Sequence, residues 1–238
     1  MTVQNTTVLV IGGTSGIGLG VARAVADRGA TVIVASRRRS SVDRALAELP
    51  AGARGTTVDL ADPGALDRLV DEVGEVDHLV YTAGEPLEMS ALADLTPDAV
   101  VGFLSTRFIG ALSAVRVFGP RLRAGGSITL TSGTAAWSPG YGVLPSSLCG
   151  AMNAMTAALA VELAPIRVNA VAPGLIRTPL WDAVPEAERQ ELYDEDARRV
   201  PLGRVGEVAD VARAYVYCME QEFSTGTVLT VEGGILLV

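Results

Sequence analysis

The chain has 238 residues, of which 49% are hydrophobic and 19% are charged, and its formal net charge is −8. This hydrophobic content is ample for a buried core and excludes an intrinsically disordered chain. The negative charge disfavours nucleic acid or an anionic membrane as a partner, because both would be repelled by the protein surface. All nineteen basic residues are arginine, so chemistry that needs a lysine amine is excluded.

Apolar runs alternate with helical patterns along the whole chain. The first strand is expected at 6–11 and the first helix at 17–28, where Gly29 caps the C-terminus. Further strands are expected at 31–35, 55–58, 77–81, 127–131, 166–171 and 227–231, and further helices before 49 and at 62–73, 96–122, 148–163, 185–198 and 208–219. Nearly all-apolar strands that alternate with helices indicate a parallel sheet covered on both faces. The sequence therefore predicts one doubly wound, Rossmann-type α/β domain over 1–238, with a seven-stranded parallel sheet.

The segments outside this pattern point to a cytoplasmic protein. Residues 1–7 are polar, and the apolar run after them has the length of one strand, so no signal peptide is expected. The Ala-rich stretch 151–163 is interrupted by polar and charged residues, which predicts a core helix and not a membrane span. Cys149 and Cys218 show no metal-ligand spacing, so the sequence predicts buried thiols and no metal site.

A glycine-rich turn joins the first strand to the first helix. Gly12, Gly16 and Gly18 follow the apolar run directly, and their spacing differs from the commoner G-x-G-x-x-G. A bound pyrophosphate needs this order of strand, tight turn and helix, because backbone N–H groups and the helix N-terminus then face its charge. A turn that only reverses the chain is the alternative, and the flanking strand and helix favour dinucleotide binding over it.

The segment after the second strand predicts which dinucleotide is bound. Positions 35–39 hold no acidic residue, and Arg37, Arg38 and Arg39 are all present. An acidic residue there would accept a hydrogen bond from a free ribose 2′-hydroxyl, whereas an arginine favours a 2′-phosphate. The sequence therefore predicts NADP(H) in preference to NAD(H), with a solvated basic loop as the alternative.

Over nearly its whole length the chain resembles the classical short-chain dehydrogenase/reductases. The resemblance rests on the motifs at 12–18, 59–60, 82–84, 167–174 with Thr178, 201–204 and 225–234. It implies that the cofactor contacts Gly12, Thr14, Ser15, Gly16, Ile17, Gly18, Ser36, Arg37, Arg38, Asp59, Leu60, Thr82, Ala83, Gly84, Pro173, Gly174, Ile176 and Thr178. It also implies a small-molecule substrate, a lid at about 179–200, and a homodimer or homotetramer packed through the helices near 96–122 and 150–163.

The catalytic positions depart from the family pattern. The family uses an Asn, a Ser and a Tyr-x-x-x-Lys pair in which the lysine lowers the pKa of the tyrosine. Aligned on the helix that follows this pair, the tyrosine and lysine positions are Pro145 and Cys149, and the asparagine position is Arg107. The serine position is Ser132, with Gly133 as the alternative one residue away. A positioned acid–base group contributes roughly 10²–10⁴ in rate. Efficient ketone reduction by the family's usual route is therefore not expected.

Three residues are candidates for an atypical catalytic site. Tyr141 lies beside the missing tyrosine, and Arg107 could supply the lost positive charge by polarising either Tyr141 or a substrate carbonyl. Ser132 could donate a hydrogen bond to that carbonyl. Against this, an arginine cannot shuttle protons, and Tyr141 could serve packing alone. The sequence favours an NADP(H)-dependent oxidoreductase acting on a carbonyl or alcohol. The alternative is a non-redox protein of this fold, either a lyase or cyclase or a regulatory module that binds NADP(H).

Overall fold

A seven-stranded parallel sheet forms the centre of the computed structural model, which describes residues 2–84 and 91–238. The strand order is β3-β2-β1-β4-β5-β6-β9. The strands are β1 (Thr7–Ile11), β2 (Thr31–Ser36), β3 (Arg54–Thr57), β4 (Val76–Tyr81), β5 (Leu122–Thr131), β6 (Arg167–Pro173) and β9 (Val228–Val231). The predicted doubly wound fold with seven parallel strands is confirmed.

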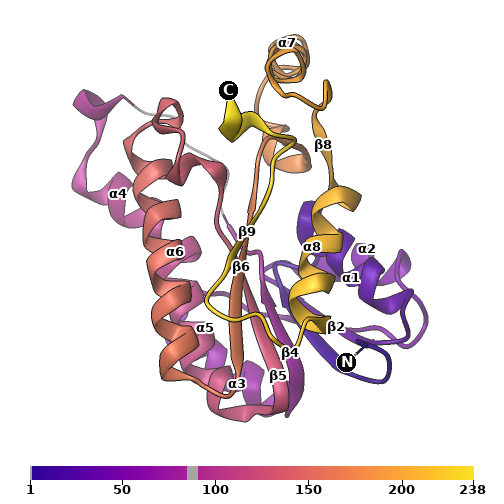
Figure 1. Ribbon diagram of the computed structural model, residues 1–238. Coiled ribbons are helices and arrows are strands. Elements are labelled where there is room, and N and C mark those ends of the chain that lie inside the picture. The colour runs from indigo at the N-terminus through magenta and orange to yellow at the C-terminus, as the bar shows by residue number, and fades with distance from the viewer. Residues whose placement is uncertain (1, 85–90) are drawn as a thin grey trace.

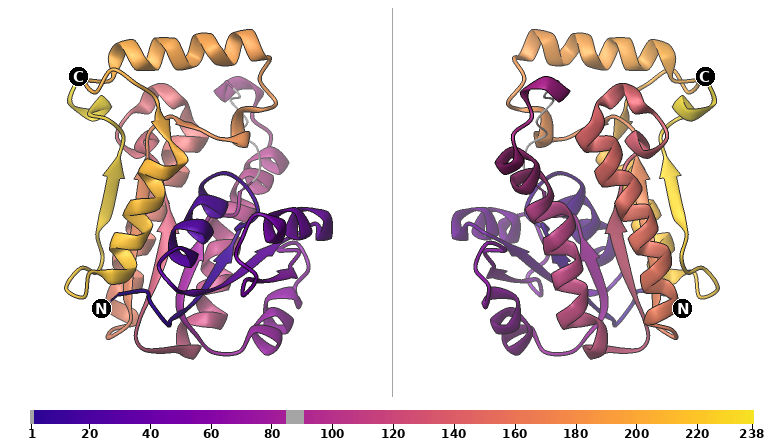
Figure 2. Two further views of the ribbon diagram at one scale, coloured as in Figure 1. Left: turned by 90° about the vertical axis from the view of Figure 1, so that its right-hand side faces the viewer. Right: turned by 90° about the vertical axis from the view of Figure 1, so that its left-hand side faces the viewer.

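Helices cover both faces of this sheet (Figure 1) (Figure 2). On one face lie α1 (Gly16–Ala26), α2 (Arg39–Ala47) and α8 (Val208–Glu220), and on the other lie α3 (Ala65–Val73), α4 (Pro97–Leu104), α5 (Ala111–Phe118) and α6 (Val143–Glu162). Helix α7 (Glu186–Arg199) lies across the end of the molecule toward which β6 and β9 point. Helix α7 is therefore placed to cover the carboxyl ends of the strands.

Strand β1 shows how the sequence builds two cores at once. Leu9 and Ile11 belong to the apolar cluster beneath α3, α5 and α6, whereas Val8 and Val10 belong to the cluster beneath α1 and α8. Successive side chains of a strand point to opposite faces, so a strand that is apolar throughout must be central. The strand order reverses between β1 and β4, and a doubly wound sheet opens a ligand crevice at such a point.

The helix expected at 96–122 is interrupted. It consists of α4, a π-helical turn at Ser105–Gly110, α5 and a short 3₁₀ turn. The hydroxyl of Tyr81 donates to the backbone oxygen of Thr106, within the π turn. A side chain that enters the helix ladder is a recognised cause of such an irregularity, and π turns are frequent at functional sites. Arg107 lies in this turn.

Helix α6 begins earlier than the sequence suggested, at Val143, so the loop expected at 132–147 is shorter. Pro145 occupies the third position of the helix. The first four N–H groups of a helix have no partner within it, so a proline fits there without losing a hydrogen bond. A small second sheet, β7 (Ile176–Arg177) with β8 (Gly206–Glu207), was also not predicted.

Two helical stretches, Pro97–Arg121 and Val143–Glu162, are long and apolar enough to cross a membrane by length and composition alone. In this fold they pack against the sheet, and their buried sides belong to the core. Their outer sides carry exposed apolar residues, namely Val101, Ile109, Leu112, Val143 and Val161. Exposed apolar residues that gather on neighbouring helices are typical of a protein contact.

Candidate functional site

A cavity of about 510 Å³ lies at the carboxyl ends of the central strands. Among the described residues that line it are all the predicted cofactor residues except Arg38, together with the predicted catalytic residues Arg107, Ser132 and Tyr141. These residues are up to 166 positions apart in the sequence, from Gly12 to Thr178. The fold therefore brings the proposed cofactor and catalytic groups to one site, as the topology required.

The glycine turn forms the floor of this cavity by close backbone packing. Gly12 has a φ of +89°, and a Cβ placed there would lie 2.5 Å from the backbone nitrogen of Ala83. A Cβ on Gly18 would overlap the carbonyl oxygen of Gly12. The Gly12 N–H donates to Ala35 across the sheet at 2.8 Å. The glycines are required because the turn and the end of β4 approach without room for a side chain.

The N-terminus of α1 faces the same cavity. Its N-cap, Ser15, has extended backbone and makes no capping hydrogen bond through its side chain, and the first turn holds no acidic residue. The terminal N–H groups and the helix dipole are therefore available to an anion. A dinucleotide pyrophosphate fits these features, since it brings negative charge and acceptor oxygens to a glycine turn followed by a helix.

At the adenosine end of the cavity the structure separates the three consecutive arginines. Arg37 lines the cavity. Arg38 is the exposed N-cap of α2, and Arg39 forms an ion pair with Asp43 at 2.8 Å. Asp59 lines the opposite side and accepts the N–H of Ala61 at 3.1 Å. Of the three, Arg37 is therefore the one placed to contact the ribose of a bound dinucleotide.

Ser132 lies at the nicotinamide end, directly after β5. Its backbone N–H donates to Val171 of β6 at 2.8 Å, which continues the sheet pairing by one residue. Its hydroxyl donates to α6, with Asn153 Oδ1 at 2.6 Å and the carbonyl oxygen of Cys149 at 3.2 Å. Sequence reasoning missed Asn153. Its spacing of four residues from Cys149 on one helix face is the signal that could have found it.

Arg107 and Cys149 lie beside this serine. The guanidinium packs on Gly84, where a Cβ would lie 2.5 Å from Nη1. Burial raises the pKa of the Cys149 thiol, and Arg107 opposes this shift only in part. The thiol therefore stays protonated at neutral pH and is a poor nucleophile. Pro145, at the tyrosine position, is buried and carries no exchangeable proton.

Tyr141 reaches the cavity from the loop before α6. Burial raises the pKa of its phenol, and Asp196 of α7 raises it further, while Arg199 and a hydrogen bond with Thr134 lower it. The charges that act on Tyr141 thus come from α7, whereas Arg107 acts on Cys149. A phenol held protonated can donate a hydrogen bond, but it releases its proton less readily than a free tyrosine. The hypothesis that Arg107 activates Tyr141 gains no support from this arrangement.

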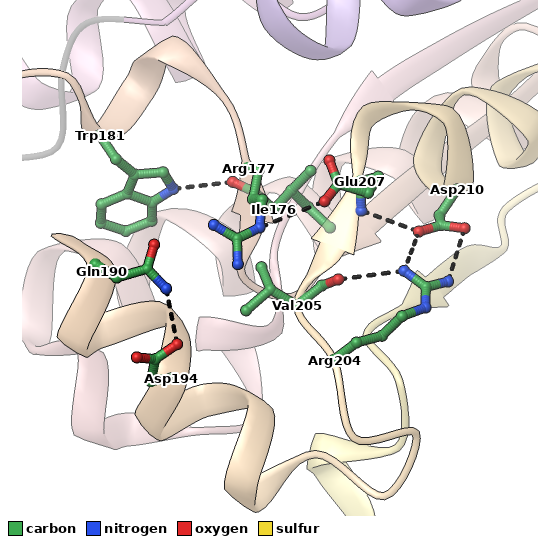
Figure 3. A network of polar contacts seen from close by, with 9 residues as sticks. All are labelled: Ile176, Arg177, Trp181, Gln190, Asp194, Arg204, Val205, Glu207 and Asp210. Atoms are coloured by element: carbon green, nitrogen blue, oxygen red, sulfur yellow. Dashed lines mark hydrogen bonds and ion pairs between the residues drawn. The ribbon is translucent and has the colours of Figure 1, made fainter. Parts of the chain in front are cut away.

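The region expected to form a lid, 179–200, contains a short turn at Pro179–Trp181 and helix α7. Pro179, Leu180 and Trp181 line the cavity. The indole of Trp181 donates to the backbone of Ile176 at 3.1 Å (Figure 3). The turn is therefore tied to β7, and β7 continues the segment that leaves the carboxyl end of β6. Closure of this segment over a ligand stays a prediction.

A polar network holds the segment that joins α7 to α8. Arg204 binds Asp210 through two hydrogen bonds, at 2.6 and 3.0 Å, and Asp210 also accepts the N–H of Glu207 at 2.9 Å (Figure 3). The Arg204 guanidinium lowers the pKa of Asp210 to about 2, and the Glu207 N–H adds to this. Among the described residues, a small apolar cluster that includes Tyr193 and Val205 packs beneath α7. The segment after α7 is therefore held by this cluster and by the Arg204–Asp210 ion pair.

Comparison with known proteins identifies the family. A family model described as "Enoyl-(Acyl carrier protein) reductase" matches residues 12–236. The short-chain dehydrogenase/reductase ATR9 of Stachybotrys chlorohalonatus is 38% identical, over 99% of both chains. The chain belongs to the short-chain dehydrogenase/reductase family. Members of this family bind a nicotinamide cofactor and act on small molecules, and the glycine turn stays the predicted site of that cofactor.

Solved structures agree with this membership. A small-chain dehydrogenase in complex with NADPH has a TM-score of 0.85 and 31% identity, covering 99% of this chain and all of its own. The structure of MalC Reductase/Diels-Alderase from Malbranchea aurantiaca has a TM-score of 0.91 and 31% identity, covering 99% of this chain and 98% of its own. The short-chain dehydrogenase/reductase family fold therefore extends over essentially the whole chain.

Proposed function

We propose that this family member is an NADP(H)-dependent oxidoreductase that acts on a carbonyl or alcohol through an atypical catalytic site. The observation that carries the proposal is the single cavity in which the glycine turn, Arg37 and the group Arg107, Ser132 and Tyr141 all meet. The family member solved with NADPH supports this choice of cofactor. Arg37 contributes a charge-assisted contact to a 2′-phosphate, which NAD(H) lacks.

The residues of this site differ in what they offer to the reaction. When bound, NADPH supplies a hydride. Arg107 stabilises negative charge that develops on a substrate oxygen, and Tyr141 offers a hydrogen bond from a phenol that stays protonated. Pro145 and Cys149 move no proton at neutral pH, so the final proton comes from water or from the substrate itself. The site therefore favours electrophiles that need little help from an acid.

Two measurements test this proposal. Fluorescence titration of NADPH and NADH gives both dissociation constants, and we expect NADPH to bind at least tenfold more tightly. NADPH absorbance then reports turnover of a panel of ketones, aldehydes and preformed iminium salts, the last of which need no proton. Equal affinity for NADH would refute the assigned specificity. Tight NADPH binding with no turnover of any panel member would refute the oxidoreductase.

A non-redox reaction is the second candidate, and one finding favours it. The relative malC of Malbranchea aurantiaca is 32% identical over 97% of this chain, and its solved structure is described as that of a reductase and Diels–Alderase. A cyclisation needs a shaped cavity and no proton relay, which fits Pro145 and Cys149. Product formation from a diene–dienophile substrate in the presence of NADP⁺, without consumption of NADPH, would establish this function.

We infer that the protein is a homodimer or homotetramer, because exposed apolar residues cover the outer sides of α4, α5 and α6. Light scattering should show a multiple of the 24.6 kDa chain. Combined Ile109→Glu and Val161→Glu substitutions should shift it to monomer, whereas Leu92→Glu, at an exposed residue outside this face, should not. A wild-type protein that is only monomeric would contradict the inference. The cytoplasmic location stays a prediction from the sequence.

A further inference from the structure

The hydroxyl of Ser132 has one hydrogen, and it donates that hydrogen in a hydrogen bond to another group of the protein. The Cys149 thiol also hydrogen-bonds Ser132, and two oxygen acceptors lie within reach of the hydroxyl, Asn153 Oδ1 at 2.6 Å and the backbone oxygen of Cys149 at 3.2 Å. Both belong to α6. Whichever of them receives the hydrogen, the O–H bond points toward the helix. The shorter distance makes Asn153 the main acceptor, since hydroxyl hydrogen bonds are most favourable near 2.7 Å.

Ser132 lines the cavity, whereas Asn153 is not part of the described lining. With its hydrogen directed at α6, the serine oxygen presents only lone pairs to the cavity. A hydroxyl in this state accepts hydrogen bonds and does not donate them. This differs from the role expected from the sequence, in which Ser132 donates to a substrate carbonyl. A carbonyl oxygen placed at Ser132 would face lone pairs and be disfavoured.

We propose that Asn153 is a positioning residue that fixes Ser132 as a hydrogen-bond acceptor. The cavity then selects substrates that carry an N–H or O–H at the point facing Ser132, such as a lactam or another secondary amide. The role of this selection in catalysis rests on the proposed function. The preference for ligands that carry an N–H or O–H is a property of binding alone. It can therefore be measured without a known substrate.

The test compares two probes that differ at one atom. 2-Pyrrolidinone carries a lactam N–H, and N-methyl-2-pyrrolidinone has a methyl group in its place. Ligand-observed NMR gives their dissociation constants for the protein in the presence of excess NADP⁺. A neutral hydrogen bond corresponds to about two- to tenfold in affinity, so we expect the N–H lactam to bind about fivefold more tightly. Equal affinities of the two lactams would overturn the proposal. So would the absence of binding by either lactam at concentrations up to about 0.5 M, the practical limit of the measurement.

Variants separate the acceptor role from simple packing. Ser132→Ala should bring the affinity ratio to about one. Asn153→Leu keeps the size of the side chain and removes the acceptor, so the ratio should fall. Asn153→Asp still accepts the serine hydrogen and should retain it. Retention of the full ratio in Asn153→Leu would refute the positioning role, and if that variant fails to fold, Ser132→Ala and Asn153→Asp decide the question.

A separate titration keeps this result distinct from the proposed function. NADP⁺ affinity should stay within twofold of wild type in both folded Asn153 variants, because Asn153 does not line the described part of the cavity. If wild-type protein fails to bind NADP⁺ but discriminates between the lactams, the proposed function fails and the acceptor assignment stands. If it binds NADP⁺ and does not discriminate, the acceptor assignment fails and the proposed function stands.

Discussion

The two ends of the cavity are built on different principles. At the adenosine end, a tight glycine turn packs on β4 and offers backbone N–H groups, so its shape depends on where side chains are absent. At the nicotinamide end, the cavity is lined by single side chains from the end of β5, from α6 and from the π turn. Pro145 fits the first turn of α6, and Cys149 is small and half-buried, so neither disturbs the fold at the positions where the resemblance expects a tyrosine and a lysine. Recognition and chemistry can therefore change independently within one domain.

The largest expected effect comes from filling the glycine turn. Gly12→Ala places a Cβ 2.5 Å from Ala83 at a φ of +89°, so the turn must move and the phosphate contacts are lost. We expect NADPH affinity to fall more than about 100-fold, as measured by fluorescence titration. Gly52→Ala is the matched control, because a Cβ at Gly52 meets nothing within 4 Å. Normal affinity in Gly12→Ala would show that this turn does not hold the cofactor.

Restoring the family's catalytic set should have the next largest effect. Pro145→Tyr and Cys149→Lys need Arg107→Asn as well, since the arginine charge acts at the cysteine position and would oppose a second cation. We expect ketone reduction by NADPH to rise about 10²-fold. The same triple variant with Pro145→Phe lacks the hydroxyl and should show no gain. An inactive tyrosine variant that still folds would mean that the nicotinamide end no longer positions a substrate.

A smaller effect is expected at the adenosine end. Arg37→Ser removes a charge-assisted contact with a 2′-phosphate, so the dissociation constant for NADPH should rise about 10- to 30-fold and that for NADH should stay constant. Arg38→Ser is the matched control, because Arg38 lies outside the described lining of the cavity. Equal losses in both variants would indicate a diffuse basic loop and not a specific contact.

The smallest effect concerns the ion pair between Arg204 and Asp210, which holds the segment between α7 and α8. The pKa of Asp210 is about 2 in the folded protein, mainly because of Arg204, and about 4 in an unfolded chain. Its contribution to stability is therefore present above about pH 4 and is lost as the pH falls toward 2. The melting temperature of Asp210→Asn should lie below that of wild type at pH 7, and the difference should shrink in acid.

The matched control is Asp194→Asn, which removes the charge of a helix-surface carboxylate that accepts a hydrogen bond from Gln190 (Figure 3). Its melting temperature should stay close to wild type at every pH. Both variants should keep NADPH affinity within about twofold, because the adenosine end does not depend on the lid. A pH-independent difference for Asp210→Asn would show that the carboxylate charge is not what holds the segment between α7 and α8.

Most of the fold could be predicted because its signals are local. Apolar runs of strand length, the Gly12–Gly18 spacing and the alternation of strands with helices depend on neighbours in the chain. The π turn at Ser105–Gly110 could not be predicted, since Tyr81, 25 residues from Thr106, makes the contact that accompanies it. The early start of α6 was missed because Pro145 suggested a loop, although a proline fits the first helical turn.

The sequence by itself determined the sheet and the family, because residue identity and spacing are sufficient for each. That Pro145 and Cys149 occupy the positions of the family's tyrosine and lysine stays a prediction. Only the tertiary structure decided that Arg37 and not Arg38 lines the cavity. It also decided that the charges that shift the pKa of Tyr141 belong to α7, and that the Ser132 hydroxyl donates a hydrogen bond to Asn153. These are questions of direction and distance between groups far apart in the chain. A hydroxyl becomes a donor or an acceptor only when its neighbours in space are known.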